Sequence, residues 1–402
     1  MNNETLLKAN VGEWSEMYVF FRLLATGKMD IADDNLVAIP NEFYKILAIL
    51  RKETKTSNEY LRSDDCIIIK IKGSDGEDEA VFKMSIEQFA SNADRLLENM
   101  QNQSGRRTAG YPEIQSFMRD LRIYSIKDVG HKRDITISLE NLHNGLAETL
   151  GFSIKSFVGK QSTLFNAGAG TNFVYQVRFP EGADIDCDRF NEYTYDGGEA
   201  IVNGKTHRLG KISYRLKRIY ELSGNIVFDH IQSDCLTQNL RIIDGELPRI
   251  LAEAILTKYS YNLTEWSDII MHLNRTNPLN YRINADSNPY EVKIKRFLQD
   301  AAMGMTPETE WNGHYDATGG QIVVKKDGEI VCYHIYELNR YLQYLFNSTR
   351  FEQPATSEDE DHPGHVRIDP TTGRPSKPFQ YGWLYKENGK YFIKINLQIR
   401  FK

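Results

Sequence analysis

The 402-residue chain lacks long hydrophobic runs, closely spaced cysteines and any overall excess of positive charge. No run approaches the roughly 18 consecutive apolar residues of a membrane-spanning helix, so no membrane segment is predicted. The N-terminal segment, with Glu4 and Glu13, has no signal-peptide pattern. The four cysteines lie far apart without a Cys-x-x-Cys pair, which favours free thiols over a structural zinc site. These absences predict a cytoplasmic protein.

The length and composition of the chain are those of a globular protein with more than one lobe. Charged residues make up 26% and hydrophobic residues 41% of the sequence, as in ordinary globular proteins. Single hydrophobic cores stop growing at roughly 250 to 300 residues. We therefore expect two lobes, or one core with a large insertion.

Basic residues gather in two local blocks, although the formal net charge of the whole chain is -6. One block spans residues 205–218, and the other begins at Gly364. A basic block can face DNA phosphates or can simply be a solvated face, and the sequence leaves both readings open. The residues proposed as DNA contacts in these blocks are Lys205, Arg208, Lys211, Arg215, Arg374 and Lys377.

Hydrophobic periodicity and turn residues predict a mixture of helices and strands. Helices are expected at 12–24, 85–100, 112–121, 246–259 and 290–303, and strands at 44–50, 66–71, 134–140, 152–155 and 173–178. Asp-Gly at 327–328 and Asn-Gly at 388–389 predict two hairpins, because these dipeptides favour tight hairpin turns. Residues 353–377 are polar and contain prolines, so an exposed loop is expected there.

Two of these strands carry an acid and a lysine in a pattern that suggests metal-assisted hydrolysis. Apolar and polar residues alternate after Asp134 and again from Phe152 to Lys155. Alternate side chains of a strand point to opposite faces, so Ser153 and Lys155 share a face. If the strands pair, a carboxylate, a hydroxyl and an ammonium group meet at one end of a sheet, where they could hold a divalent metal and a water. The same spacing also occurs in ordinary half-buried strands.

The segment that follows Lys155 is rich in glycine, amides and hydroxyls. Small residues let a backbone approach a ligand closely, and these polar groups can donate to phosphates or base edges. A glycine-rich turn before a strand is the alternative. The candidate DNA contacts in this segment are Lys160, Ser162, Thr163, Asn166, Thr171 and Asn172.

Six stretches form one ordered pattern along the chain: 12–16, Asp134 with 151–156, 162–166 with 171–173, 317–320, 332–336 and 397–401. Together they resemble the HpaII-like family of type II restriction endonucleases. The resemblance covers most of the chain and implies a nuclease of the PD-(D/E)xK superfamily. It also implies an α/β (α+β) fold with a central mixed sheet flanked by helices, Mg²⁺-dependent cleavage of double-stranded DNA at a short, CCGG-like site, and a cognate DNA methyltransferase. Cutting both strands of a symmetric site would suit a homodimer.

The resemblance also implies roles for the acid and lysine residues. Asp134 would bind the metal with the Ile154 carbonyl, and Lys155 would orient or deprotonate the attacking water. Ser153 stands where the superfamily commonly has an acid, and it would hold a water at the metal. A helix acid would then complete the site, with Glu16 the first candidate and Glu13 the second. A structural acid at a helix N-terminus is the alternative for Glu16.

Three regions follow from this interpretation, and two other functions stay open. Residues 1–180 would form the N-terminal part of the nuclease core, 181–304 a mainly helical insertion that contacts DNA, and 305–402 a hairpin-rich region that completes the core and contacts DNA. The alternatives are a methylation- or lesion-dependent nuclease of the same superfamily and a DNA-binding protein that does not cleave.

Overall fold

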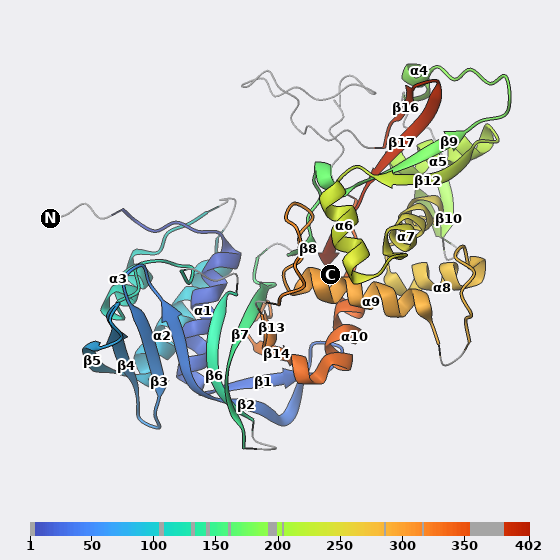
Figure 1. Ribbon diagram of the computed structural model, residues 1–402. Coiled ribbons are helices and arrows are strands. Elements are labelled where there is room, and N and C mark those ends of the chain that lie inside the picture. The colour runs from blue at the N-terminus through green and yellow to red at the C-terminus, as the bar shows by residue number, and fades with distance from the viewer. Residues whose placement is uncertain are drawn as a thin grey trace. The chain divides into compact units, whose positions relative to one another are not determined.

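The computed structural model divides the chain into two compact units (Figure 1). Unit 1 comprises residues 1–162 and 314–344, and unit 2 comprises residues 163–313 and 345–402. The structure describes residues 5–103, 108–129, 133–141, 145–159, 162–191, 199–202, 205–284, 287–315, 317–353 and 382–402. The chain therefore leaves unit 1 after β7, returns to it for one hairpin and a helix, and ends in unit 2.

Unit 1 is built on a nine-stranded mixed sheet in the order β1-β14-β13-β7-β6-β2-β3-β4-β5. The β1–β14 and β13–β7 pairs are parallel, and the other neighbours are antiparallel. The strands are β1 (Lys28–Ala32), β2 (Ala38–Lys52), β3 (Ser57–Arg62), β4 (Cys66–Lys72), β5 (Asp78–Ser85), β6 (Ile135–Asn141), β7 (Ala147–Ser156), β13 (Gly320–Val324) and β14 (Ile330–His334). The predicted mixture of helices and strands is confirmed, as is the pairing of the two strands at 134–140 and 152–155.

The sheet is not a simple open layer, because β1 pairs with both β14 and β2. This second pairing closes β1, β14, β13, β7, β6 and β2 into a six-stranded barrel, and β3 to β5 extend from β2. The length of β2 allows the closure. Its first half pairs with β1 from Ala38 to Lys45, and its second half pairs with β3 from Ala48 to Lys52. The sequence predicted a central mixed sheet and gave no sign of this closed part.

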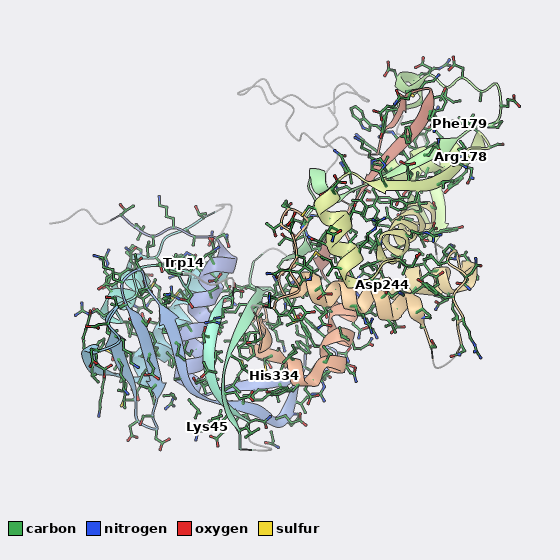
Figure 2. All side chains as sticks on the ribbon, in the orientation of Figure 1. Trp14, Lys45, Arg178, Phe179, Asp244 and His334 are labelled. Atoms are coloured by element: carbon green, nitrogen blue, oxygen red, sulfur yellow. The ribbon has the colours of Figure 1, made fainter. Side chains whose placement is uncertain are left out.

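Helix α1 (Val11–Thr26) packs against the sheet through almost every turn, together with α2 (Ile86–Gln101) and α3 (Pro112–Asp120). Its aromatic and aliphatic side chains join the main hydrophobic core of the unit. Asn10 caps α1 and Ser85 caps α2, each in a reciprocal capping box, so both helices begin where the sequence predicts. Figure 2 places Trp14, on the first turn of α1, far from Lys45 and His334 at the other end of the unit.

Unit 2 combines three small antiparallel sheets, counted over the described residues, with a group of helices. Its sheets run β12-β9-β17-β16 and β15-β18-β8, and β10 (Glu199–Val202) pairs with β11 (Lys205–Arg208). The other strands are β8 (Thr163–Phe165), β9 (Asn172–Arg178), β12 (Asn225–Ile231), β15 (Thr349–Phe351), β16 (Leu384–Glu387), β17 (Lys390–Asn396) and β18 (Ile399–Phe401). The helices are α4 (Cys187–Asn191), α5 (Lys211–Glu221), α6 (Asp234–Ile243), α7 (Leu247–Tyr261), α8 (Trp266–Thr276) and α9 (Pro289–Ala302), and α10 (Leu338–Ser348) crosses from one unit to the other.

The predicted hairpins are both confirmed. The Asp-Gly turn joins β13 to β14, and the Asn-Gly turn joins β16 to β17. Most of the predicted loop at 353–377 lies outside the described residues. No helix in the described ranges is both long and apolar enough to cross a membrane.

Candidate active site

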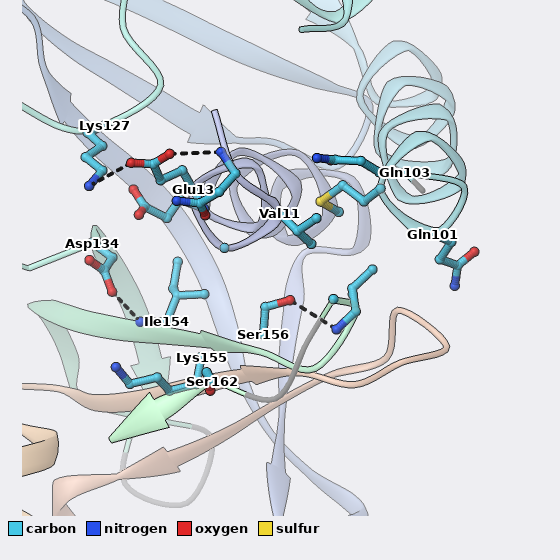
Figure 3. A pocket seen from close by; sticks show the side chains of 16 residues that line it. Val11, Glu13, Gln101, Gln103, Lys127, Asp134, Ile154, Lys155, Ser156 and Ser162 are labelled. Carbon is cyan, nitrogen blue, oxygen red and sulfur yellow. Dashed lines mark hydrogen bonds and ion pairs between the residues drawn. The ribbon is translucent and has the colours of Figure 1, made fainter. Parts of the chain in front are cut away.

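An open cleft of about 1070 Å³ lies in unit 1, where the first turns of α1 face the end of β7 (Figure 3). Its charged lining consists of three acids and two lysines: Glu13, Glu16, Asp134, Lys127 and Lys155. The carboxylates and Lys155 were predicted from the sequence, and the structure brings them together from α1, the start of β6 and β7. The cleft therefore joins segments that are more than a hundred residues apart in the sequence.

Asp134, the residue before β6, is held in place by backbone groups of β7. Its N–H donates to the Phe152 carbonyl at 3.0 Å, and its carboxylate accepts the Ile154 N–H at 2.6 Å. Burial raises the pKa of Asp134, while the Ile154 N–H and the nearby Lys155 ammonium oppose that rise. The carboxylate is thus fixed beside Lys155 rather than free in solvent.

Glu16 and Lys155 are both desolvated in this cleft. Burial and, to a smaller extent, the Asp134 carboxylate raise the pKa of Glu16 to about 8. Burial lowers the pKa of Lys155, which the charges of Asp134 and Glu16 oppose. Two carboxylates that repel each other beside a buried lysine form a site that a cation would stabilise.

The two acids of α1 differ in their partners. The Glu13 carboxylate accepts the Asn10 N–H at 3.0 Å in the capping box and forms an ion pair with Lys127 at 3.1 Å. Glu16, one turn later, has Asp134 as its strongest charged neighbour. The geometry therefore favours Glu16 over Glu13 as the acid that acts together with Asp134.

A pair of serines fixes α1 against β7 next to these residues. The Ser15 and Ser156 hydroxyls lie 2.8 Å apart, and both side chains are buried. Each is adjacent in sequence to a residue of the cleft, Ser15 to Glu16 and Ser156 to Lys155. This contact was not predicted, because nothing in the sequence of either segment indicates that the two serines meet.

Ser153 does not line the cleft, although it lies on β7 two residues before Lys155. It is half-buried, and its register partner on β13 is Gln321. Its predicted meeting with Asp134 and Lys155 at one end of the sheet therefore stays a prediction. Its predicted role in holding a water stays a prediction.

The glycine-rich segment after β7 divides into residues that could contact a ligand and residues that cannot. Ser162 lines the cleft, Thr163 is half-buried in β8, and Asn166 is exposed. Lys160 lies outside the described residues.

Thr171 and Asn172 are completely or almost completely buried, with exposures of 0% and 1%. The Thr171 hydroxyl binds the backbone of Gly168, and the Asn172 side chain binds those of Gln232 and Asn396. These contacts hold the start of β9 in place. The assignment of Thr171 and Asn172 as DNA contacts is corrected accordingly.

Arg215, in the first basic block, also has a structural position. It is fully buried in α5, and its guanidinium donates to the carbonyls of Gly382 and Asn191, each at 2.7 Å. Its assignment as a DNA contact is therefore corrected as well. Lys211 is half-buried at the start of α5. The side chains of Lys205 and Arg208 and the whole of Arg374 and Lys377 lie outside the described structure.

Comparison with known proteins assigns the chain to a family. The family model described as HpaII restriction endonuclease matches residues 10–401. The chain is 36% identical over 397 residues to the type II restriction enzyme HpaII of Haemophilus parainfluenzae, with 98% of each chain covered. No solved structure matches the chain.

The chain belongs to the HpaII restriction endonuclease family. The predicted family is confirmed, and so is the predicted activity of a type II site-specific deoxyribonuclease that hydrolyses DNA. The chain is therefore a DNA-cleaving enzyme.

Proposed function

We propose that the chain cleaves double-stranded DNA in a Mg²⁺-dependent reaction, with Asp134, Glu16 and Lys155 as the catalytic group of a PD-(D/E)xK-type core. The observation that carries this proposal is the pairing of the two desolvated carboxylates beside Lys155 in one cleft. Buried like charges destabilise a fold, and a bound cation offsets their repulsion. A cation beside a lysine is the arrangement that hydrolysis of a phosphodiester requires.

The residues of the cleft fit a hard divalent cation. Type II restriction endonucleases generally use divalent metal ions. Asp134, Glu16 and the Ile154 carbonyl would supply the oxygen donors that Mg²⁺ prefers. The described residues contain no group of three or more His, Cys, Asp or Glu side chains that could hold a metal, so backbone and solvent oxygens must complete the coordination. Bound Mg²⁺ would offset the negative charge that develops on the phosphate oxygens.

Lys155 would orient the attacking water and stabilise negative charge at the phosphate. Its ammonium group is anchored on β7, and its desolvation strengthens any interaction with an anion. The lowered pKa of Lys155 also lets it take or give a proton closer to neutral pH. Ser153 would hold a water nearby, and Glu13 would hold Lys127 and cap α1 instead of binding metal.

DNA contacts outside the catalytic group are proposed for residues that stay accessible or lie outside the described structure. They are Lys160, Ser162, Thr163, Asn166, Lys205, Arg208, Lys211, Arg374 and Lys377. Arginine and lysine are the usual readers of guanine in the major groove, so the basic residues are the candidates for recognising a CCGG-like site. We further propose a cognate DNA methyltransferase as the functional partner and a homodimer as the assembly that cuts both strands.

Digestion of unmethylated plasmid DNA, followed by sequencing of the cut ends, tests this function. Purified protein with Mg²⁺ should give discrete fragments whose ends share one short motif, and chelation of Mg²⁺ should stop the reaction. Cuts that appear only on methylated or damaged DNA would replace this proposal with the alternative nuclease. Binding to DNA without cuts on any substrate would identify a DNA-binding protein that does not cleave.

A further inference from the structure

Lys127 is a second cation in the cleft, and no role was predicted for it from the sequence. It lies in the irregular segment between α3 and β6, and its side chain is 64% exposed. Its ammonium group forms an ion pair with Glu13 at 3.1 Å, and its charge acts on Glu16. Figure 3 shows Lys127 on the same side of the cleft as Glu13, with Asp134 close by.

The segment that carries Lys127 is fixed by the end of β2. Arg51 and Glu53 form an ion pair at 2.9 Å, and both side chains are at least nine-tenths buried. Arg51 donates to the Ser125 and Ile126 carbonyls at 2.5 and 2.9 Å, and Glu53 accepts the Tyr124 N–H at 3.2 Å.

Two more hydrogen bonds join the same segment to β2. The Lys52 N–H donates to the Asp128 carboxylate at 2.8 Å, and the Val129 N–H donates to the Lys52 carbonyl at 3.0 Å. A buried ion pair adds little net stability on its own, because both charges must be desolvated. Here it immobilises a loop on which Lys127 points into the cleft.

The position of Lys127 suits an anion that arrives from solvent. An exposed lysine is a compact point charge with three donors, and it can exchange one carboxylate for a phosphate oxygen at little cost. Lys155 is desolvated below the carboxylates, whereas Lys127 stands at the accessible side of the cleft. A DNA backbone phosphate that enters the cleft would meet Lys127 before it meets Lys155.

We propose that Lys127 binds a non-bridging oxygen of a DNA backbone phosphate in the cleft and releases Glu13 as it does so. This inference rests on the proposed function, because the ligand is the substrate of that reaction. Lys127 is a DNA-contacting residue that holds the strand in place, whereas Lys155 acts on the reacting groups. Loss of Lys127 should therefore weaken binding more than chemistry.

The experiment compares Lys127→Gln with Lys45→Gln. Lys45 is a matched control, because it is exposed and pairs with one acid, Glu140, at 3.8 Å, and Figure 2 places it far from the first turn of α1. The affinity for a duplex that contains the cleaved motif is measured by fluorescence anisotropy at several salt concentrations. Lys155→Ala is present in every variant so that the duplex stays intact.

Lys127→Gln should weaken binding about 5- to 50-fold and reduce the slope of log K against log salt by about one unit, as for one lost phosphate contact. Lys45→Gln should change neither quantity by more than about twofold. With Lys155 intact, Lys127→Gln should raise KM while kcat stays within about threefold. Unchanged affinity and salt slope would overturn the inference.

Glu13→Gln separates a phosphate contact from a purely structural ion pair. Glutamine keeps the oxygen that accepts the Asn10 N–H but removes the charge that holds Lys127. It should leave the affinity unchanged or improve it, because Lys127 is then free of its competitor. A loss equal to that of Lys127→Gln would overturn the inference. Wild-type protein is assayed for cleavage in parallel, and a wild type that does not cut DNA would overturn the proposed function itself.

Discussion

Two desolvated lysines, one in each unit, differ in what surrounds them. Lys155 in unit 1 and Lys258 in unit 2 are both desolvated, and burial lowers the pKa of each, that of Lys258 to about 8. Lys155 shares an open cleft with Asp134 and Glu16. Lys258 lies on α7 with its ammonium group 4.9 Å from the centre of the Tyr259 ring. A shifted pKa alone therefore does not identify an active site, whereas convergence of the shifted group with others in a cleft does.

Replacing Lys155 should greatly reduce DNA cleavage, whereas replacing Lys258 should leave it almost unchanged. Lys155→Ala should reduce cleavage about 10³-fold, because the group that acts on the water and the phosphate is lost. DNA affinity should stay within about threefold of the wild type. The measurements are single-turnover cleavage and anisotropy with the same duplex.

Lys258→Met is the matched control for Lys155→Ala. It removes a buried ammonium group and keeps most of the side-chain volume, so stability should stay the same or rise slightly. Cleavage should stay within about twofold. Equal losses of cleavage activity in the two variants would contradict the conclusion that only Lys155 belongs to an active site.

Arg215→Met should affect stability rather than catalysis. The carbonyls of Gly382 and Asn191 would lose a charged donor in the interior of unit 2, which should cost about 2 to 4 kcal/mol of unfolding free energy. Urea unfolding measures this loss, and the salt dependence of DNA binding by the folded protein should not change. A reduced salt slope with unchanged stability would restore Arg215 as a DNA contact.

Glu16→Gln should change how the metal-free protein responds to pH. The pKa of Glu16 is about 8 in the folded protein, against 4.5 as its ordinary value. The folded state therefore holds the proton more tightly, and stability should fall by about 2 kcal/mol as pH rises from about 5 to 8. Thermal unfolding in EDTA at both pH values should show this fall in the wild type and not in Glu16→Gln.

The same substitution should weaken the response to Mg²⁺. In the wild type, less Mg²⁺ should be needed for half-maximal cleavage at pH 8.5 than at pH 6.5, because a proton on Glu16 competes with the cation. Glu16→Gln should need more Mg²⁺ and lose most of this pH dependence. If Glu13→Gln alone had that effect, Glu13 would be the helix acid of the site.

Local patterns predicted the elements of the fold better than their assembly. Capping residues such as Asn10 and Ser85 and the two hairpin turns act over a few residues, so the sequence reveals them directly. The closure of the barrel depends on a second partner for β1, which is a long-range contact. No local pattern records which strands meet at a distance.

The residues of the candidate site were likewise predicted where the signal is local and missed where it depends on long-range contacts. Asp134 and Lys155 were found because strand alternation and the family motif point to them, and Glu16 because it lies on the helix of that motif. Lys127 was missed because its position depends on the buried Arg51–Glu53 pair, which lies more than seventy residues away. Arg215 was misassigned because the sequence of a basic run does not reveal whether a side chain faces solvent or buried backbone carbonyls.

The order of the strands along the chain limits when the enzyme can become active during synthesis. β7, which carries Lys155, has β13 as its parallel partner, and β13 begins only at Gly320, after most of unit 2. Until then that side of β7 is an exposed edge without its partner. A nascent chain therefore cannot complete the sheet that supports Lys155 before nearly four-fifths of its length has been made. We therefore expect a chain that ends before Gly320 to lack cleavage activity.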